Sequence, residues 1–159
     1  MLCLEGAQAG LSWLTILKKR DNYRKAFANF DPRIIANGDD DSKVEQLLQN
    51  EGIVRNRLKI KSVMKNARGF KEIVEEHGSF SKFVWGFVGG KVKVNEWKSL
   101  KECPSQNEDS VRMSKELKKY GFSFVGPTIV YAFMQAVGMV NDHIVDCFRY
   151  EECKKATRS

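Results

Sequence analysis

The chain has 159 residues, of which 42% are hydrophobic and three are proline, a composition typical of one folded, non-repetitive domain. Lys and Arg outnumber Asp and Glu by 27 to 20, and the resulting net charge of +7 favours a polyanionic partner without separating DNA from RNA or an acidic membrane surface. No apolar run reaches the length of a membrane span, and Glu5 interrupts the first apolar residues, so we expect neither a membrane anchor nor a secretory leader.

The cysteines are Cys3, Cys103, Cys147 and Cys153. An even number permits disulfides, but nothing else in the sequence indicates secretion. We therefore expect reduced thiols in an intracellular protein. No C-x-x-C pair occurs, so the sequence encodes no local zinc ribbon.

The first predicted helix covers about residues 1–10 and breaks near Gly10. Ser12 is a good N-cap for a second helix from Trp13 to about residue 20, because its hydroxyl can accept a hydrogen bond from a free amide of the first turn. The spacing of the apolar residues predicts that Leu14 and Leu17 face inward.

The helical pattern continues over residues 21–30. The pair 31–32 is Asp-Pro, which supplies an N-cap and a first helical position for a short helix that reaches Ala36. The acidic turn 39–41 starts another helix, which ends at the Asn-Glu-Gly stretch 50–52.

The longest predicted helix covers residues 55–76 and ends at His77-Gly78. Its apolar residues recur every three or four positions and form one inward stripe, while the remainder is strongly basic and typical of a solvated face. We assign no ligand role to His77. The stripe consists of Ile60, Val63, Met64, Ala67, Phe70, Ile73 and Val74.

An aromatic-rich short helix is predicted at 79–87 and a break at Gly89-Gly90. Residues 92–97 alternate and favour a brief extended piece, but one alternating run does not make a sheet. Ser105 and Glu108 have the spacing of a capping box, which predicts a helix from about residue 106 to 120.

Residues 121–126 form a glycine-bounded turn between that helix and one that begins at Pro127. The next amides, on Thr128 and Ile129, point back towards the turn, where a phosphate can approach them. The pattern therefore indicates a helix-hairpin-helix that binds DNA. The competing interpretation is an ordinary corner between two helices with Gly at the preceding C-cap.

Six sequence blocks resemble the DNA-3-methyladenine glycosylase I family, which belongs to the helix-hairpin-helix glycosylases. The resemblance runs from Met1 to about Tyr150. It implies an all-α, helix-hairpin-helix DNA glycosylase fold, with one helical domain over residues 1–150 and a polar, frayed tail over 151–159. The blocks are LEGAQAGLSW (4–13), FDP (30–32), GIVRNRLKI (52–60), NAR (66–68), WGFVGG (85–90) and SKELKKYGFSFVGPTIVYAFMQAVGMVNDHIVDC (114–147).

The activity implied by the resemblance is base-excision repair: hydrolysis of the N-glycosidic bond of 3-methyladenine in double-stranded DNA. The enzyme is expected to be monofunctional, because the turn lacks the lysine of the lyase members and Ser123 and Thr128 stand nearby instead. The implied partner is duplex DNA with an alkylated adenine, met by a monomer in the cytoplasm or nucleoid.

Glu5 and Trp13 are the residues that the resemblance places at the base. Methylation at N3 gives adenine a positive charge, so the base is already a good leaving group. Trp13 is expected to stack on it and favour the cation, on the order of 1–2 kcal/mol. Glu5, the expected catalytic and base-binding carboxylate, would accept hydrogen bonds from the adenine edge. Without the resemblance, Glu5 would be interpreted as a surface carboxylate.

The lesion must leave the base stack to be cut. By resemblance, Gln8, Gly10 and Leu11 form the loop that wedges into the gap, although Leu11 alone would equally fit a core. The hairpin would hold a phosphate without reading sequence, and the two lysines before it would add salt-dependent attraction. The expected DNA-binding residues there are Gly121, Val125, Gly126, Thr128, Lys118 and Lys119.

The family also carries a structural zinc. His143 and Cys147 match its C-terminal ligand pair, and their spacing of four would place both on one helical face. The N-terminal Cys and His ligands, with aromatic residues of the base pocket, would lie upstream of Met1. We therefore expect weak or absent zinc and an incomplete pocket wall.

Two other functions compete with the glycosylase. One is a catalytically impaired, DNA-binding remnant of the family; the other is a helical interaction protein without a nucleic-acid partner. Asp146 lies near the position of the catalytic aspartate of the wider superfamily, but its neighbours are the two zinc ligands, which favours a surface or supporting role.

Overall fold

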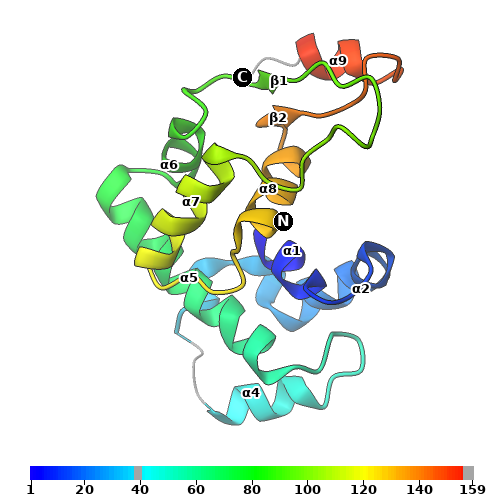
Figure 1. Ribbon diagram of the computed structural model, residues 1–159. Helices are drawn as coiled ribbons and strands as arrows, with labels where there is room; N and C mark the ends of the chain where they lie inside the picture. Colours follow the sequence, from blue (N-terminus) through cyan, green and yellow to red (C-terminus); the bar gives the residue numbers. More distant parts are fainter. Residues whose placement is uncertain (38–40, 156–159) are drawn as a thin grey trace.

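The computed structural model describes residues 1–37 and 41–155. Within them the regular secondary structure is helical apart from one pair of two-residue strands, which confirms the all-α prediction (Figure 1). None of the described helices combines the length and apolarity needed to cross a membrane. The elements are α1 (Leu2–Gln8), α2 (Trp13–Ala26), the 3₁₀ turn η1 (Ala28–Phe30), α3 (Pro32–Ile35), α4 (Asp41–Leu48), α5 (Arg57–His77), α6 (Phe80–Gly86), β1 (Lys93–Val94), α7 (Glu108–Lys119), α8 (Pro127–Ala136), β2 (Val140–Asn141) and α9 (Tyr150–Lys155).

Two hydrophobic cores hold the fold together. One lies among α1–α5, and the other among α6, α7, α8 and the end of α5. Helix α1 contributes Leu4 to the first core and Leu2 to the second, and α5 likewise contributes Ile60 and Ile73. Because these two helices are shared, they determine how the two halves of the molecule sit against each other.

Helix α2 is one continuous helix, and its inward face differs from the predicted one. Leu14 and Leu17 are 58% and 43% exposed, so the inward assignment was wrong. Ile16 and Tyr23 are buried instead, because their spacing of seven places both on the face that meets the core. Leu14 lies about 200° round the helix from Ile16 at about 100° per residue.

Most of the predicted caps in the first half are confirmed. The Asp31 carboxylate accepts from Arg33 N at 2.9 Å and starts α3. Helix α4 begins at Asp41, while residues 39–40 of the predicted acidic turn lie outside the described part. Helix α5 ends at Gly78, whose φ of 78° is the left-handed conformation that glycine adopts at low cost.

The cap of α7 differs from the predicted Ser105. Asn107 accepts from Ser110 N at 2.8 Å, and Ser110 Oγ accepts from Asn107 N at 3.0 Å, so the capping box lies two residues later. Strand β1 pairs in parallel with β2, with Lys93 opposite Val140. The extended piece was predicted but this pairing was not, because an alternating run carries no information about a partner 47 residues away.

Residues 151–155, which were predicted to belong to a polar, frayed tail, are helical and form most of α9. Tyr150 is 5% exposed, and its carbonyl accepts from Asn141 Nδ2 at 3.0 Å. This burial anchors the start of the helix beside β2. Residues 156–159 lie outside the described part.

Gly69 on α5 is the position where the fold tolerates no side chain. A Cβ there would lie 2.2 Å from Tyr120 O and 2.6 Å from the Phe122 ring. We expect Gly69→Ala to lower the free energy of unfolding by at least about 1–3 kcal/mol, measured by chemical denaturation, because backbone must move to admit the methyl group. Gly86→Ala is the control: its Cβ would meet nothing within 4 Å, and an equal loss there would contradict the explanation.

Candidate functional site

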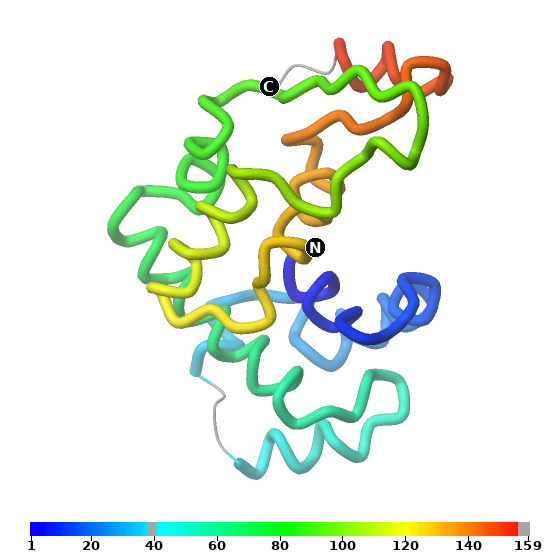
Figure 2. The backbone as a smooth tube through the Cα atoms, viewed as in Figure 1, coloured from blue at the N-terminus to red at the C-terminus, as the bar shows by residue number. Residues whose placement is uncertain are grey.

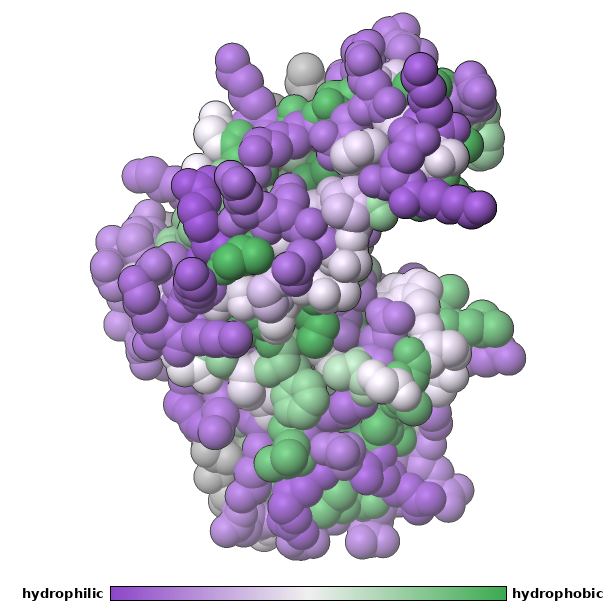
Figure 3. Space-filling model, viewed as in Figure 1, coloured by the Kyte–Doolittle hydropathy of each residue, from purple (hydrophilic) through white to green (hydrophobic). Residues whose placement is uncertain are grey.

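The surface is hollowed between the part that carries α2 and the part that carries β2 and α9 (Figure 3). A cavity of about 560 Å³ lies here. Its lining comes from α1 and α2 on one side and from α8, β2 and their neighbours on the other. The lining residues are Met1, Glu5, Gln8, Trp13, Val92, Ala132, Gln135, Ala136, Gly138, Val140, Asn141, Asp142, His143 and Cys153.

Glu5 faces this cavity from the middle of α1. The residue is 6% exposed, which excludes the surface-carboxylate interpretation. Burial raises the pKa of the Glu5 carboxyl above its usual value. Within the described residues the carboxylate oxygens of Glu5 accept no hydrogen bond, so they remain available to a ligand in the cavity. A buried carboxylate in this situation favours a ligand that brings donors or positive charge.

Trp13 is the first residue of α2 and lines the same cavity, half-buried. The helix begins there because Ser12 caps it, accepting from Thr15 N at 3.2 Å, as predicted. The structure thus brings Glu5 and Trp13 together at one cavity, with Gln8 beside them. An aromatic face and a carboxylate in one cavity suit a flat, cationic ring.

Residues 8–11 form the turn between α1 and α2, here called the wedge loop. Gly10 has φ 74°, which a residue with a side chain rarely adopts, and Leu11 N donates to Gln8 O at 2.6 Å. Leu11 is 41% exposed, so the alternative core role is wrong. An exposed leucine at the tip of a tight turn is suited to entering a gap in a base stack.

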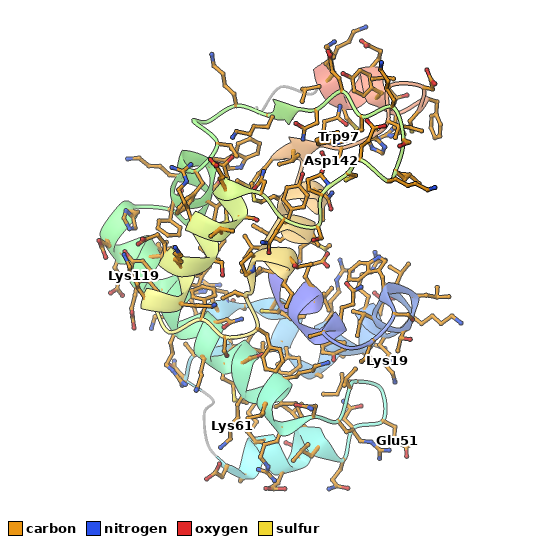
Figure 4. The ribbon with its side chains drawn as sticks, in the orientation of Figure 1. Lys19, Glu51, Lys61, Trp97, Lys119 and Asp142 are labelled. Carbon is orange, nitrogen blue, oxygen red and sulfur yellow. The ribbon has the colours of Figure 1, made fainter. Side chains whose placement is uncertain are left out.

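Asp142 is the polar centre of the cavity wall, and the sequence analysis assigned it no role. Four side chains donate hydrogen bonds to its carboxylate, two from the segment 95–97 and two from α8. Trp97 and Asp142 lie side by side in Figure 4. The donors are Asn95 Nδ2 (2.7 Å) and Trp97 Nε1 (2.8 Å) to Oδ1, and the Tyr131 hydroxyl (2.6 Å) and Gln135 Nε2 (2.7 Å) to Oδ2.

Burial raises the pKa of Asp142, but the hydrogen bonds to the carboxylate outweigh it and hold the pKa below its usual value. Its stabilising contribution is therefore complete above the unfolded pKa of about 3.9 and is lost as the pH falls through the folded-state pKa.

We expect Asp142→Asn to lower stability at neutral pH and to weaken the fall in stability at acid pH, measured by thermal unfolding from about pH 2 to 7. Asp146→Asn, at an exposed carboxylate nearby, is the control; an unchanged fall in stability at acid pH in Asp142→Asn contradicts the explanation.

The hairpin at 121–126 is held on several sides. At the end of α7, Gly121 N donates to Lys118 O at 3.0 Å and Phe122 N to Leu117 O at 3.1 Å. These two bonds form a Schellman motif, with Gly121 in the left-handed conformation at φ 75°. Val125 is 1% exposed, so only its backbone can face a nucleic acid.

Helix α8 begins where the hairpin ends. Its first intrahelical bond runs from Val130 N to Gly126 O at 2.9 Å, so the amides of Thr128 and Ile129 precede the helical ladder. A Cβ on Gly126 would meet nothing within 4 Å, which leaves the approach to these amides open. An anion is favoured at such an end by the amides and by the helix dipole.

Lys118 and Lys119 are both exposed at the end of α7, before the hairpin, and Lys119 is labelled in Figure 4. Lys119 Nζ lies 2.7 Å from Glu116 Oε1, an exposed pair that leaves the ammonium free to exchange partners. The hairpin therefore combines open amides with mobile positive charge.

His143 and Cys147 lie in the non-helical segment between β2 and α9, so the prediction that they share a helical face is wrong. They still meet: Cys147 Sγ is 3.5 Å from His143 Nδ1. Tetrahedral ligands at Zn–S about 2.3 Å and Zn–N about 2.0–2.1 Å lie about 3.6 Å apart, so the pair fits two zinc positions. No group of three or more His, Cys, Asp or Glu suited to a metal occurs in the described residues.

A model of the methyladenine glycosylase family matches residues 1–150. The chain belongs to this family. It is 49% identical over 151 residues to DNA-3-methyladenine glycosylase 1 of Escherichia coli K12, covering 94% of this chain and 80% of that protein. It is 46% identical over 146 residues to DNA-3-methyladenine glycosylase of Haemophilus influenzae, covering 92% and 78%.

Solved structures of the family have the same fold. A crystal structure of 3-methyladenine DNA glycosylase I superposes with a TM-score of 0.88 at 51% identity, covering 92% of this chain and 80% of that one. A structure addressing 3-methyladenine recognition by the Staphylococcus aureus enzyme superposes at 0.91 with 38% identity, covering 94% and 79%. The predicted family and fold are therefore confirmed, while the roles of individual residues stay predictions.

Proposed function

We propose that this protein is a DNA base-excision repair glycosylase that hydrolyses the N-glycosidic bond of 3-methyladenine. The observation that carries the proposal is Glu5, a buried carboxylate without a protein hydrogen-bond partner among the described residues, at one cavity with Trp13. Membership of the methyladenine glycosylase family supports it, as does the likeness to an enzyme solved in complex with 3-methyladenine.

The chemistry needs little acid catalysis, since the methylated base carries a positive charge. When the C1′–N9 bond breaks, its electrons neutralise the departing base and water adds to C1′ with loss of a proton. Glu5 holds the adenine edge and Trp13 stacks on the ring. Asp142, at the same cavity, adds a second negative charge that favours a cationic ligand over a neutral base.

The proposed substrate is a duplex, from which the lesion is flipped at a cost of a few kcal/mol. The hairpin amides grip a backbone phosphate, and Leu11 occupies the gap that the base leaves. We propose a monofunctional reaction because the hairpin 121–126 carries no lysine. We propose that the enzyme acts as a monomer on cellular DNA, in the cytoplasm or nucleoid.

Release of 3-methyladenine from alkylated duplex DNA, followed by chromatography, tests the function. We expect free base and an abasic strand that stays intact until alkali is added. No release with retained, salt-sensitive duplex binding would instead select the impaired remnant. No release and no duplex binding would select an interaction protein without a nucleic-acid partner.

We also propose that His143 and Cys147 are two ligands of a structural zinc. Because the described residues supply two donors of the four that zinc prefers, we expect weak binding, with less than one equivalent left after dialysis by elemental analysis. Cys147→Ser should abolish what remains and Cys103→Ser should not. One equivalent of zinc retained by the unaltered protein contradicts the weak binding.

A further inference from the structure

Helix α5 contacts both proposed DNA-contacting segments through one face. Lys59, Asn66 and Gly69 are seven and three residues apart, a spacing that places them on the same side of a helix. The backbone trace shows α5 running beside both α1 and the hairpin, which are distant in sequence (Figure 2). Each of these three residues touches one of the two segments.

Lys59 holds the wedge loop. Its Nζ donates to Ala7 O at 2.8 Å and to Ala9 O at 2.5 Å, the carbonyls at the C-terminal end of α1. These carbonyls have no amide of their own helix to accept from, and the helix dipole favours a cation there. Desolvation lowers the pKa of Lys59 relative to an exposed lysine. The Lys59 ammonium thus fixes the loop by hydrogen bonds instead of being fully solvated.

Asn66 holds the hairpin. Its Oδ1 accepts from Ser123 N at 2.9 Å, and its Nδ2 donates to Ser123 O at 3.2 Å, so one side chain satisfies both backbone groups of the residue in the middle of the turn. Asn66 is 4% exposed. One turn further on, Gly69 lets the hairpin backbone approach α5 closely, since a Cβ there would collide with Tyr120 O.

Helix α1, which leads into the wedge loop, also contacts the hairpin directly. A Cβ on Gly6 of α1 would lie 3.0 Å from Phe124 O in the hairpin. Helix α5, helix α1 and the hairpin therefore close a triangle in which each side is a direct contact. A shift of the hairpin along α5 would therefore also change the position of the wedge loop.

We propose that Lys59 and Asn66 are positioning residues that set the separation between the wedge loop and the hairpin, so that a duplex gripped by the hairpin presents its gap to Leu11. The inference rests on the proposed function, because it assigns these segments to one bound duplex. The two residues have different expected roles. Asn66 supports the phosphate contact, which any duplex makes, whereas Lys59 supports insertion of Leu11 into a gap, which is present only at a lesion site.

The test compares dissociation constants for an undamaged duplex, the same duplex with a tetrahydrofuran abasic analogue, and free 3-methyladenine. Asn66→Ala should weaken both duplexes about tenfold or more and alike, because the two hydrogen bonds that orient the hairpin are lost. Lys59→Met should weaken the abasic duplex by about tenfold and leave the undamaged duplex within about twofold. Both should bind the free base within about twofold of the unaltered protein, since neither residue lines the cavity.

Three further variants separate positioning from charge and stability. Lys61→Met removes the same charge from α5, where Lys61 pairs with Asp41, and Ser62→Ala removes a buried hydrogen bond to Lys59 O within α5; neither should alter the abasic preference. Lys59→Arg should restore it. If Lys59→Met keeps the wild-type preference for the abasic duplex, the role of Lys59 is overturned. If either variant loses affinity for all three ligands in proportion to its fall in melting temperature, the positioning role of that residue is overturned. If the unaltered protein excises no base, the proposed function fails, while the duplex series still decides this inference.

Discussion

Glu5→Gln is expected to weaken binding of free 3-methyladenine about 10–100-fold, the value of one or two hydrogen bonds to a charged group. The same substitution should raise stability at neutral pH. Burial raises the pKa of Glu5, so the folded protein binds its proton more tightly than the unfolded chain does. Stability therefore falls as the pH rises from about 4.3 through the folded-state pKa, and glutamine removes that loss.

Calorimetric titration with the free base and thermal unfolding at about pH 4 and pH 8 measure the two effects. Glu75→Gln, at an exposed position of α5, is the matched control and should change neither. Trp13→Ala should also weaken base binding, because the ring face that stacks on the base is removed. Unaltered affinity in both Glu5→Gln and Trp13→Ala would refute the site, whereas reduced affinity with unchanged stability would refute only the cost assigned to the buried carboxylate.

Gly126→Asp is expected to weaken duplex binding by about 100-fold or more, because a carboxylate would stand where the phosphate is held and like charges across an interface cost several kcal/mol. The protein should still fold. The backbone at Gly126 has φ −61° and ψ 161°, and a side chain there has open space. Aspartate is also a preferred N-cap, so α8 should gain stability while the affinity for DNA falls.

Gly126→Ser separates charge from bulk, since serine caps the helix without a negative charge. We expect it to bind more tightly than Gly126→Asp at low salt, as measured by fluorescence anisotropy with a labelled duplex. The salt dependence should also be shallower for the aspartate variant, because a protein that no longer holds this phosphate releases fewer counterions from the DNA. Unchanged duplex affinity in Gly126→Asp would contradict the proposal that the hairpin binds a backbone phosphate.

Stability and function make opposite demands at both positions. In the proposed site, the buried carboxylate of Glu5 is expected to destabilise the fold while it binds the ligand, and the uncapped helix end at Gly126 is expected to leave amides open to a phosphate. In each case the variant that suits the fold better is expected to bind worse. This opposition is typical of sites built for a ligand rather than for folding.

Signals that act within a few residues were predicted well. Ser12, Asp31 and Gly78 lie at helix ends as expected, because a cap satisfies orphan backbone groups of its own helix. Where two candidate caps lie close together, the local signal was ambiguous: Asn107 caps α7 rather than Ser105. The inward face of α2 was mistaken for a related reason, since Leu14 and Ile16 are both apolar and the surrounding core selects between them.

The sequence alone established an all-α fold of the methyladenine glycosylase family, a hairpin before Pro127, and the pair Glu5 and Trp13 as candidates for the base. These depend on residues close together in the chain or on motifs specific to the family. Folding decided which side chains share a cavity. The donors of Asp142 include Asn95 and Trp97, 47 and 45 residues away, and Lys59 reaches carbonyls 52 and 50 residues away. Hydrogen bonds across such separations form only once helices pack, so no local sequence pattern predicts them.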